Sequence, residues 1–224
     1  MQLLIIYCVI FGTTVGSFLT AVVSRQITGG SILRPARSHC DQCSRQLAWF
    51  ELIPIISFIV LRGRCRTCLH SIPYHVLLAE VFAGCLMLNF KPDFHHICFI
   101  VIGFLLLYLS LWDWQIQQVA SWTLRLLGIV CCLTAISSSH QVSFWVFLII
   151  WLANQFVTKQ NRFIGLADID VFCCLGMVLG LLNVTWVLLI ASCLAIIVQL
   201  AMDRHQLAFL PFLSVGFLVV ILTM

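Results

Sequence analysis

Charged residues are scarce in this sequence. Only 9% of its 224 residues are Asp, Glu, Lys or Arg, whereas 62% are hydrophobic and the mean hydropathy is +1.10. One soluble core of this size could not bury so much apolar surface. The scarcity of charge therefore excludes an ordinary soluble domain and indicates an integral membrane protein.

Two further features are missing. The twelve basic residues lack an interleaved aromatic platform in a soluble module, so the net charge of +4 gives no reason to expect nucleic acid as a partner. The first apolar stretch has no basic residue before it and no small-x-small pattern after it. This predicts a retained anchor and not a cleaved signal peptide.

Apolar stretches recur along the chain at lengths close to the roughly 20 residues that a spanning helix needs. They predict an all-α polytopic membrane protein with about eight transmembrane helices, at 3–23, 76–90, 97–112, 120–137, 142–157, 169–182, 184–201 and 207–223. Gly180 and Asn183 mark the division between the sixth and seventh of these. The predicted organisation is a first transmembrane helix over 1–23, a loop domain over 24–75, and a core of about seven helices over 76–224.

The basic residues indicate the orientation. With the N-terminus outside, ten of the twelve fall in segments on the cytoplasmic side, Arg125 lies just inside the fourth span, and only Lys91 lies outside. This asymmetry is typical of the positive-inside bias. The loop over 24–75 is therefore expected in the cytoplasm, and its apolar segment Leu52 to Leu61 is expected on the membrane surface.

The loop contains two C-x-x-C pairs, Cys40 with Cys43 and Cys65 with Cys68. Two such pairs can supply the four thiolates of a structural zinc site. Reduced unliganded thiols and a redox pair are the alternatives, and His39 and His70 could act as substitute ligands or support the ligands. The other eight cysteines lie in apolar spans and are expected to pack as small hydrophobic residues.

Two aspartates at the ends of apolar segments are candidate catalytic residues. In the eight-span arrangement Asp113 and Asp168 share one membrane level near the cytoplasmic face, where the small residues Gly165 and Ala167 would permit close packing. Two nearby carboxylates in a low dielectric can share one proton and activate water. The alternative is that each is only a helix-start residue.

Other acids are less favoured. Asp170 competes with Asp168, but side chains two residues apart on a helix differ by about 200° in direction, so one of them at most faces Asp113. Glu80 lies inside the second span and is a candidate supporting residue because it needs a partner or a polar cavity. The remaining four acids have the features of ordinary loop or boundary residues: Asp41, Glu51, Asp93 and Asp203.

Taken in order, these motifs resemble those of the type IV prepilin leader peptidases, intramembrane aspartyl proteases of the G-x-G-D type that include the peptidases for competence pilin-like proteins. The similarity runs along almost the whole chain. It is carried by Gly16-Ser17-Phe18-Leu19 with Arg25, the flanks of both cysteine pairs, Leu52-Ile53-Pro54-Ile55-Ile56-Ser57, Leu77-Leu78-Ala79-Glu80, Asp113, Gly165-Leu166-Ala167-Asp168 and Phe209-Leu210-Pro211-Phe212. The sequence departs from the family pattern at three places: Ala167 replaces the second motif glycine, Val119-Ala120-Ser121 stands where Leu-Pro-Asp is usual, and Asp170 stands where lysine is common.

The resemblance implies a multi-pass enzyme of the cell inner or plasma membrane. Its partners would be type IV pilin-like precursors, from which it would remove a basic leader at the cytoplasmic boundary, with Asp113 and Asp168 as the catalytic pair. Many members also methylate the new N-terminus with S-adenosylmethionine, and the sequence shows no strand followed by a Gly-rich turn that would mark the cofactor site.

Two other functions fit parts of the sequence. A membrane thiol oxidoreductase would use the C-x-x-C pairs, although it needs those thiols near an oxidising side or a quinone. A non-enzymatic pilus assembly factor or a transporter would use its buried acids to pair with Arg125 or to carry ions.

Overall fold

The computed structural model describes residues 2–31, 38–40, 42–119, 121–136, 141–160, 166–202 and 207–224. The chain separates into two compact units, 1–90 and 91–224, and each is described by itself. In the described parts of the chain no strand forms, and extended pairing is limited to two isolated β-bridges in the loop. The predicted all-α class is therefore confirmed for these residues.

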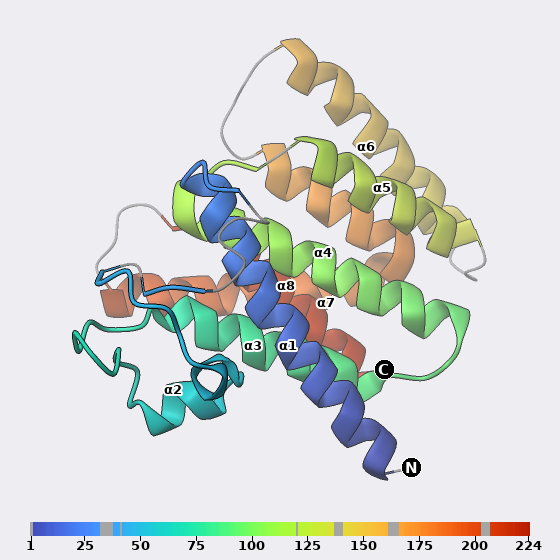
Figure 1. Cartoon of the computed structure of the whole chain (residues 1–224). Coiled ribbons are helices and arrows are strands. Elements are labelled where there is room, and N and C mark those ends of the chain that lie inside the picture. Colours follow the sequence, from blue (N-terminus) through green and yellow to red (C-terminus); the bar gives the residue numbers. More distant parts are fainter. Residues whose placement is uncertain are drawn as a thin grey trace. The chain divides into compact units, whose positions relative to one another are not determined.

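The first unit pairs two apolar helices and carries the loop between them (Figure 1). Its elements are α1 (Gln2–Ile27), the 3₁₀ turn η1 (Trp49–Leu52), the short helix α2 (Ile56–Val60), α3 (Tyr74–Leu86) and the 3₁₀ turn η2 (Met87–Asn89). Helix α1 packs against α3 with almost no space between the backbones. A Cβ at Gly16 would lie 2.7 Å from the carbonyl oxygen of Ala79, so glycine is needed for this approach.

The second unit is built around α7. Its helices are α4 (Phe94–Ile116), α5 (Ser121–Ile136), α6 (Gln141–Gln160), α7 (Leu166–Met202) and α8 (Leu210–Thr223). Helix α7 packs against α5, α6 and α8, and α8 also packs against α4. The buried side chains are mainly Leu, Val, Phe and Cys from all five helices, including Cys131, Cys173 and Cys174. Several of the span cysteines thus pack as small core residues, as expected.

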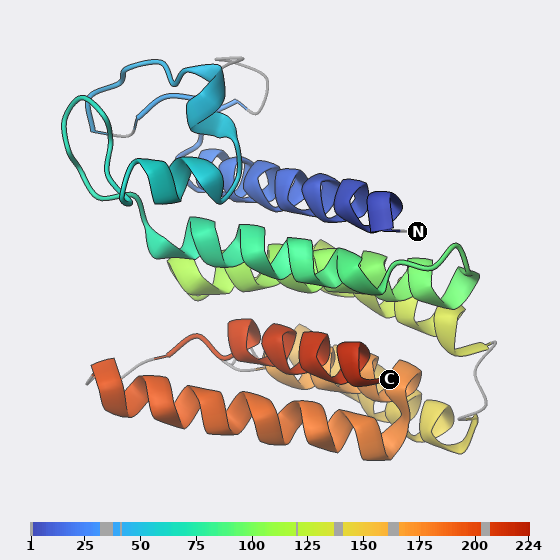
Figure 2. The same cartoon turned by 90° about the horizontal axis from the view of Figure 1, so that it is seen from below.

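Helix α7 is broken at Gly180, whose φ of 77° and ψ of 172° are not helical. The helix axis changes direction there, and the second arm then runs beside α8 (Figure 2). Only glycine adopts this region of backbone space readily. The helix is thus broken near the predicted division, whereas the two arms as separate membrane spans stay a prediction.

All eight predicted apolar segments are mainly helical in the structure. Three described helices are long and apolar enough to cross a membrane, at Leu3–Ile27, Phe94–Ile116 and Ala167–Ala201. Four further helical segments are also apolar but shorter, at Tyr74–Asn89, Ser121–Ile136, Val142–Gln155 and Leu210–Thr223. The helical positions were thus predictable, whereas the count of eight membrane crossings stays a prediction.

Candidate functional site

The two cysteine pairs are built on the same backbone turn, used twice. In the first turn (39–46) the Cys40 N–H donates to the Arg45 carbonyl and the Ser44 N–H to the Cys40 carbonyl, each at 2.9 Å. The second turn (64–71) repeats this pattern. The Cys65 N–H donates to the His70 carbonyl at 2.8 Å, and the Leu69 N–H donates to the Cys65 carbonyl at 3.0 Å. The residue four positions after the first cysteine is left-handed in both turns, with φ of 54° at Ser44 and 56° at Leu69. Asp41, inside the first turn, is outside the described residues.

The repeated turns bring the four thiols together. The Sγ atoms of Cys40, Cys43, Cys65 and Cys68 all lie within 4.8 Å of one another, and those of Cys40 and Cys68 are 3.7 Å apart. Four sulfurs around one zinc at about 2.3 Å would be about 3.8 Å apart at the edges of the tetrahedron. The donor set and its spacing therefore fit zinc.

The backbone also prepares this site for thiolates. The N–H groups of Cys68 and Thr67 donate to the Cys65 sulfur and lower the pKa of this thiol to about 6. The His70 N–H acts in the same direction on Cys68, but burial and the neighbouring thiols outweigh it and raise the pKa of Cys68 to about 11. A bound cation would favour the thiolate form of these cysteines.

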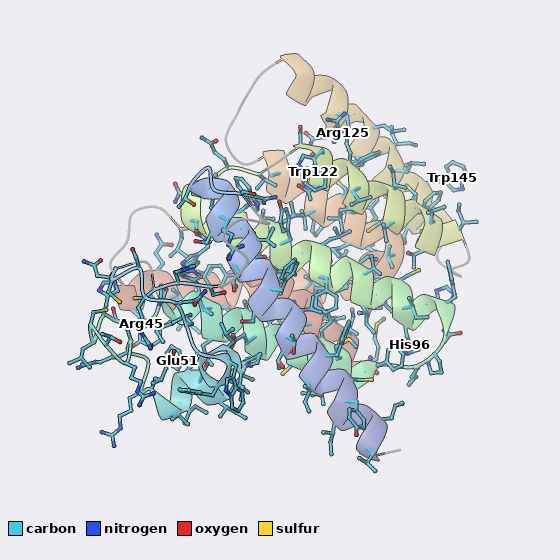
Figure 3. The ribbon with its side chains drawn as sticks, viewed as in Figure 1. Arg45, Glu51, His96, Trp122, Arg125 and Trp145 are labelled. Carbon is cyan, nitrogen blue, oxygen red and sulfur yellow. The ribbon has the colours of Figure 1, made fainter. Side chains whose placement is uncertain are left out.

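Glu51 supports the first cysteine turn, so its interpretation as an ordinary loop acid was wrong. Its side chain is only 1% exposed, and its two carboxylate oxygens accept from the Arg45 guanidinium at 2.6 Å and from the Ala48 N–H at 2.7 Å. The Ala48 amide and then Arg45 lower the pKa of Glu51 against the effect of burial. Arg45 and Glu51 lie together in the loop (Figure 3), where the pair ties η1 to the turn that carries Cys40.

Asp113 connects the end of α4 to the start of α8. It is half-buried in the last turn of α4, and its carboxylate accepts a hydrogen bond of 3.2 Å from the Leu210 N–H. The first N–H groups of a helix have no partner within that helix, and Pro211 next to Leu210 has no N–H at all. Asp113 thus satisfies a free donor of α8 and still has lone pairs available.

Asp168 lies in the first turn of α7 and is also half-buried. Its carboxylate and that of Asp113 are near enough for their charges to interact. Ala167 before it packs against the core cluster of the second unit. Gly165 is outside the described residues. The end of α4 and the starts of α7 and α8 thus bring together two carboxylates that are separated by 54 residues in the sequence.

Asp170 is directed to a different helix. It is only 3% exposed, and its carboxylate accepts from the Asn154 amide at 2.8 Å and from the Gln155 amide at 3.1 Å to each oxygen. Both amides belong to α6. From the sequence, the angle of about 200° between the side chains of Asp168 and Asp170 predicted that they face different ways. The sequence did not predict which groups Asp170 would meet.

Glu80 is 5% exposed on α3 and holds the loop from inside the first unit. Its carboxylate accepts the Ile55 N–H at 2.7 Å, and the Ser17 hydroxyl of α1 donates to the same group. Ile55 has φ 62° and ψ −51°, and the Ile56 N–H donates to the Pro54 carbonyl at 2.6 Å. This is a γ-turn of the strained type, centred on a β-branched residue. Glu80 therefore stabilises a costly turn just before α2.

Comparison with known proteins gives one family. Residues 10–93 match the model of the bacterial peptidase A24 N-terminal domain. The chain is 42% identical over 81 residues to a prepilin leader peptidase/N-methyltransferase of Myxococcus xanthus. It is 27% identical over 256 residues to a protein of the same name from Burkholderia pseudomallei, and 25% identical over 244 residues to a type 4 prepilin-like proteins leader peptide-processing enzyme of Escherichia coli. No solved structure matches this chain significantly.

These matches differ in how much they cover. The Myxococcus match includes 36% of this chain and 24% of the relative, so the chain covers only about a quarter of that protein. The Burkholderia match includes 94% of this chain and 82% of the relative, and the Escherichia match 92% and 88%. The similarity therefore extends over both units of the structure.

Proposed function

Because this chain belongs to the type IV prepilin leader peptidase family, we propose that it is a membrane endopeptidase that removes the basic leader from pilin-like precursors. The observation that supports this most directly is the pair of interacting carboxylates, Asp113 and Asp168, in an otherwise apolar helical unit. Among the described residues, neither carboxylate forms an ion pair with Arg or Lys. Such a pair is suited to moving protons.

The proposed reaction divides two roles between these acids. One carboxylate accepts a proton from water while the water oxygen attacks the scissile carbonyl carbon, and the other acid donates its proton to the leaving nitrogen. The C–N bond then breaks, leaving the leader's carboxyl group and the free amine of the mature protein. Asp113 accepts from the N–H groups of Leu210 and Phe209, which hold the carboxylate in place without neutralising it.

The proposed topology follows the eight helical segments. The N-terminus is outside and the cysteine loop is in the cytoplasm, on the same side as Asp113 and Asp168, where most basic residues of the chain are found. Zinc would be held by Cys40, Cys43, Cys65 and Cys68 and would stabilise the loop, since a four-thiolate site leaves no open position for substrate.

The names of the relatives support a second activity, methylation of the new N-terminus. S-adenosylmethionine would supply the methyl group. Among the described residues no strand leads into a Gly-rich turn that could hold it.

The test is co-expression with a pilin-like precursor, followed by the N-terminal mass of the product. We expect leader loss with the wild type and none with Asp113→Asn or Asp168→Asn, with or without an added methyl group on the wild-type product. Asp93→Asn is the matched control. This exposed acid lies just before the first residue of α4, whereas Asp113 lies in the last turn of the same helix. Cleavage that survives either of the first two substitutions would refute the aspartate mechanism.

The thiol oxidoreductase makes an opposite prediction. There, substitution of the cysteines would abolish activity without removing a metal, and the aspartates would be dispensable. Titration of free thiols before and after chelation distinguishes the two, because a structural site releases four thiols for each zinc removed.

A further inference from the structure

Helix α2 has one apolar face that is exposed in the structure. Ile56, Ile59 and Val60 are 57%, 66% and 72% exposed. Residues spaced by three and four positions lie on one side of a helix, so these three side chains form a single surface. We call this surface the α2 face. It belongs to the polar loop and not to one of the candidate spans.

Two contacts fix α2 to the first half of α3. Glu80 of α3 holds the strained turn at Ile55, immediately before α2. On the other side of α2, the Phe58 ring packs against the ring of Tyr74, with their centroids 6.0 Å apart. Tyr74 is the first residue of α3, and its own side chain is 75% exposed. Aromatic residues at the ends of apolar helices are typical of the membrane interface. These contacts therefore hold α2 at the level where α3 would enter the bilayer.

Arginines follow the α2 face directly in the chain. Arg62 and Arg64 are both exposed and lie within four residues of Val60. An apolar face next to basic side chains is the pattern that binds a membrane surface, where the apolar groups enter the acyl boundary and the basic groups contact lipid phosphates. The loop is also joined to apolar helices at both ends, which keeps it close to the bilayer.

We propose that the α2 face, with Arg62 and Arg64, is an interfacial anchor that binds the anionic lipid surface of the membrane. The anchor gives the loop a second attachment besides its two helices and holds the cysteine site beside the bilayer. This proposal requires only that the chain is in a membrane, so it stands apart from the peptidase activity. If the proposed cleavage also occurs, the anchor would hold the loop near the position where a basic leader meets the membrane.

The test is hydrogen exchange of residues 57–64 in the intact protein, in nanodiscs of phosphatidylcholine with or without phosphatidylglycerol. We expect slower exchange with phosphatidylglycerol, by up to about 25-fold, because each arginine near an anionic surface contributes about five-fold. Arg62→Gln/Arg64→Gln should remove this difference, whereas Lys91→Gln/Arg125→Gln, which removes the same charge from the other unit, should keep it. Equal exchange of the unaltered protein in both lipids would overturn the proposal, and that comparison needs no variant to fold.

A second measurement identifies what covers the α2 face. A photoreactive amino acid replacing Ile59 should give an adduct with the mass of a phospholipid, whereas the same group replacing Thr67, an exposed residue at the tip of the second cysteine turn, should not. Adducts from position 59 to another protein or to another part of this chain, with no lipid adduct, would assign the surface to a protein contact and refute the anchor. Neither measurement uses cleavage, so failure here and failure of the proposed peptidase are distinguishable.

Discussion

The same substitution at two neighbouring aspartates should have opposite effects on activity and stability. Asp168→Asn and Asp170→Asn both replace a carboxylate by an amide in the first turns of α7. Asp168 interacts with Asp113, whereas Asp170 is bound by amides of α6. We expect the first change to abolish cleavage in a stable protein and the second to destabilise an active one.

The structure sets the magnitude for Asp170→Asn. Its carboxylate accepts three hydrogen bonds from the NH₂ groups of Asn154 and Gln155. Replacing one oxygen by NH₂ removes an acceptor, which costs about 1 kcal/mol, and places two donors against each other in a buried site, which costs about 1–3 kcal/mol. A total of about 2–4 kcal/mol corresponds to a decrease of about 4–16 °C in apparent Tm for a chain of this size.

Asp168→Asn should behave differently on both counts. The amide relieves the repulsion from Asp113, so the apparent Tm should stay the same or increase. Loss of an acid-base group decreases the rate by about 10²–10⁴-fold, and loss of one member of a pair that acts as a unit should reach the upper part of that range.

The assay is precursor cleavage per folded enzyme, with thermal unfolding of the same detergent-purified samples. Asp170→Asn/Asn154→Asp provides a rescue, because it exchanges the acid and the amide between α7 and α6 and should restore most of the Tm. If Asp170→Asn abolished cleavage at an unchanged Tm, or if Asp168→Asn cleaved normally, the assignment of roles would be incorrect.

Three further predictions concern the first unit. Purified protein should contain one zinc per chain, and Cys68→Ser should lose it, as measured by elemental analysis; retention of a full equivalent would argue against the four-thiolate site. Glu51→Gln should weaken the zinc-bound loop by about 1–3 kcal/mol at pH 7 in chelator competition. The pKa of Glu51 is lowered, so its contribution is complete above about pH 4.5 and is lost as the pH falls through the lower folded value; the difference from wild type should disappear below it. Gly16→Leu should decrease the apparent Tm because its Cβ would meet the Ala79 carbonyl, whereas Gly30→Leu, with no atom nearer than 3.5 Å, should not.

The cysteine loop shows what short sequence spacing can predict. Two C-x-x-C pairs were enough to expect four converging thiols, because the geometry of each pair is set within four residues. The repeated turn was not predicted, since Ser44 and Leu69 share a left-handed backbone and not a residue type. The role of Glu51 was missed for a related reason. Its partner Arg45 is six residues away across an irregular segment, where no helical or strand period indicates which side chains meet.

For the helices, too, local features were predictable from the sequence and tertiary features were not. Apolar runs predicted where each helix lies, and Gly180 predicted the break in α7, because both follow from properties of the local chain. Helix length was less informative about membrane crossing, since several segments that are apolar throughout end after 10–17 residues. A tilted or paired helix can be short and still cross, so composition alone does not give the number of crossings.

The acids needed tertiary contacts to be told apart. Glu80, Asp113, Asp168 and Asp170 all lie in apolar surroundings, and each was a functional candidate on the cost of burying an ionisable group. That cost has to be met by partners, and the partners differ: backbone N–H groups for Glu80 and Asp113, side-chain amides for Asp170, and a second carboxylate for Asp168. Donors stabilise an acid in place, so they explain why it is tolerated. A like charge does not stabilise it, and the proximity of Asp168 to Asp113 is the feature that the proposed proton sharing during hydrolysis would use.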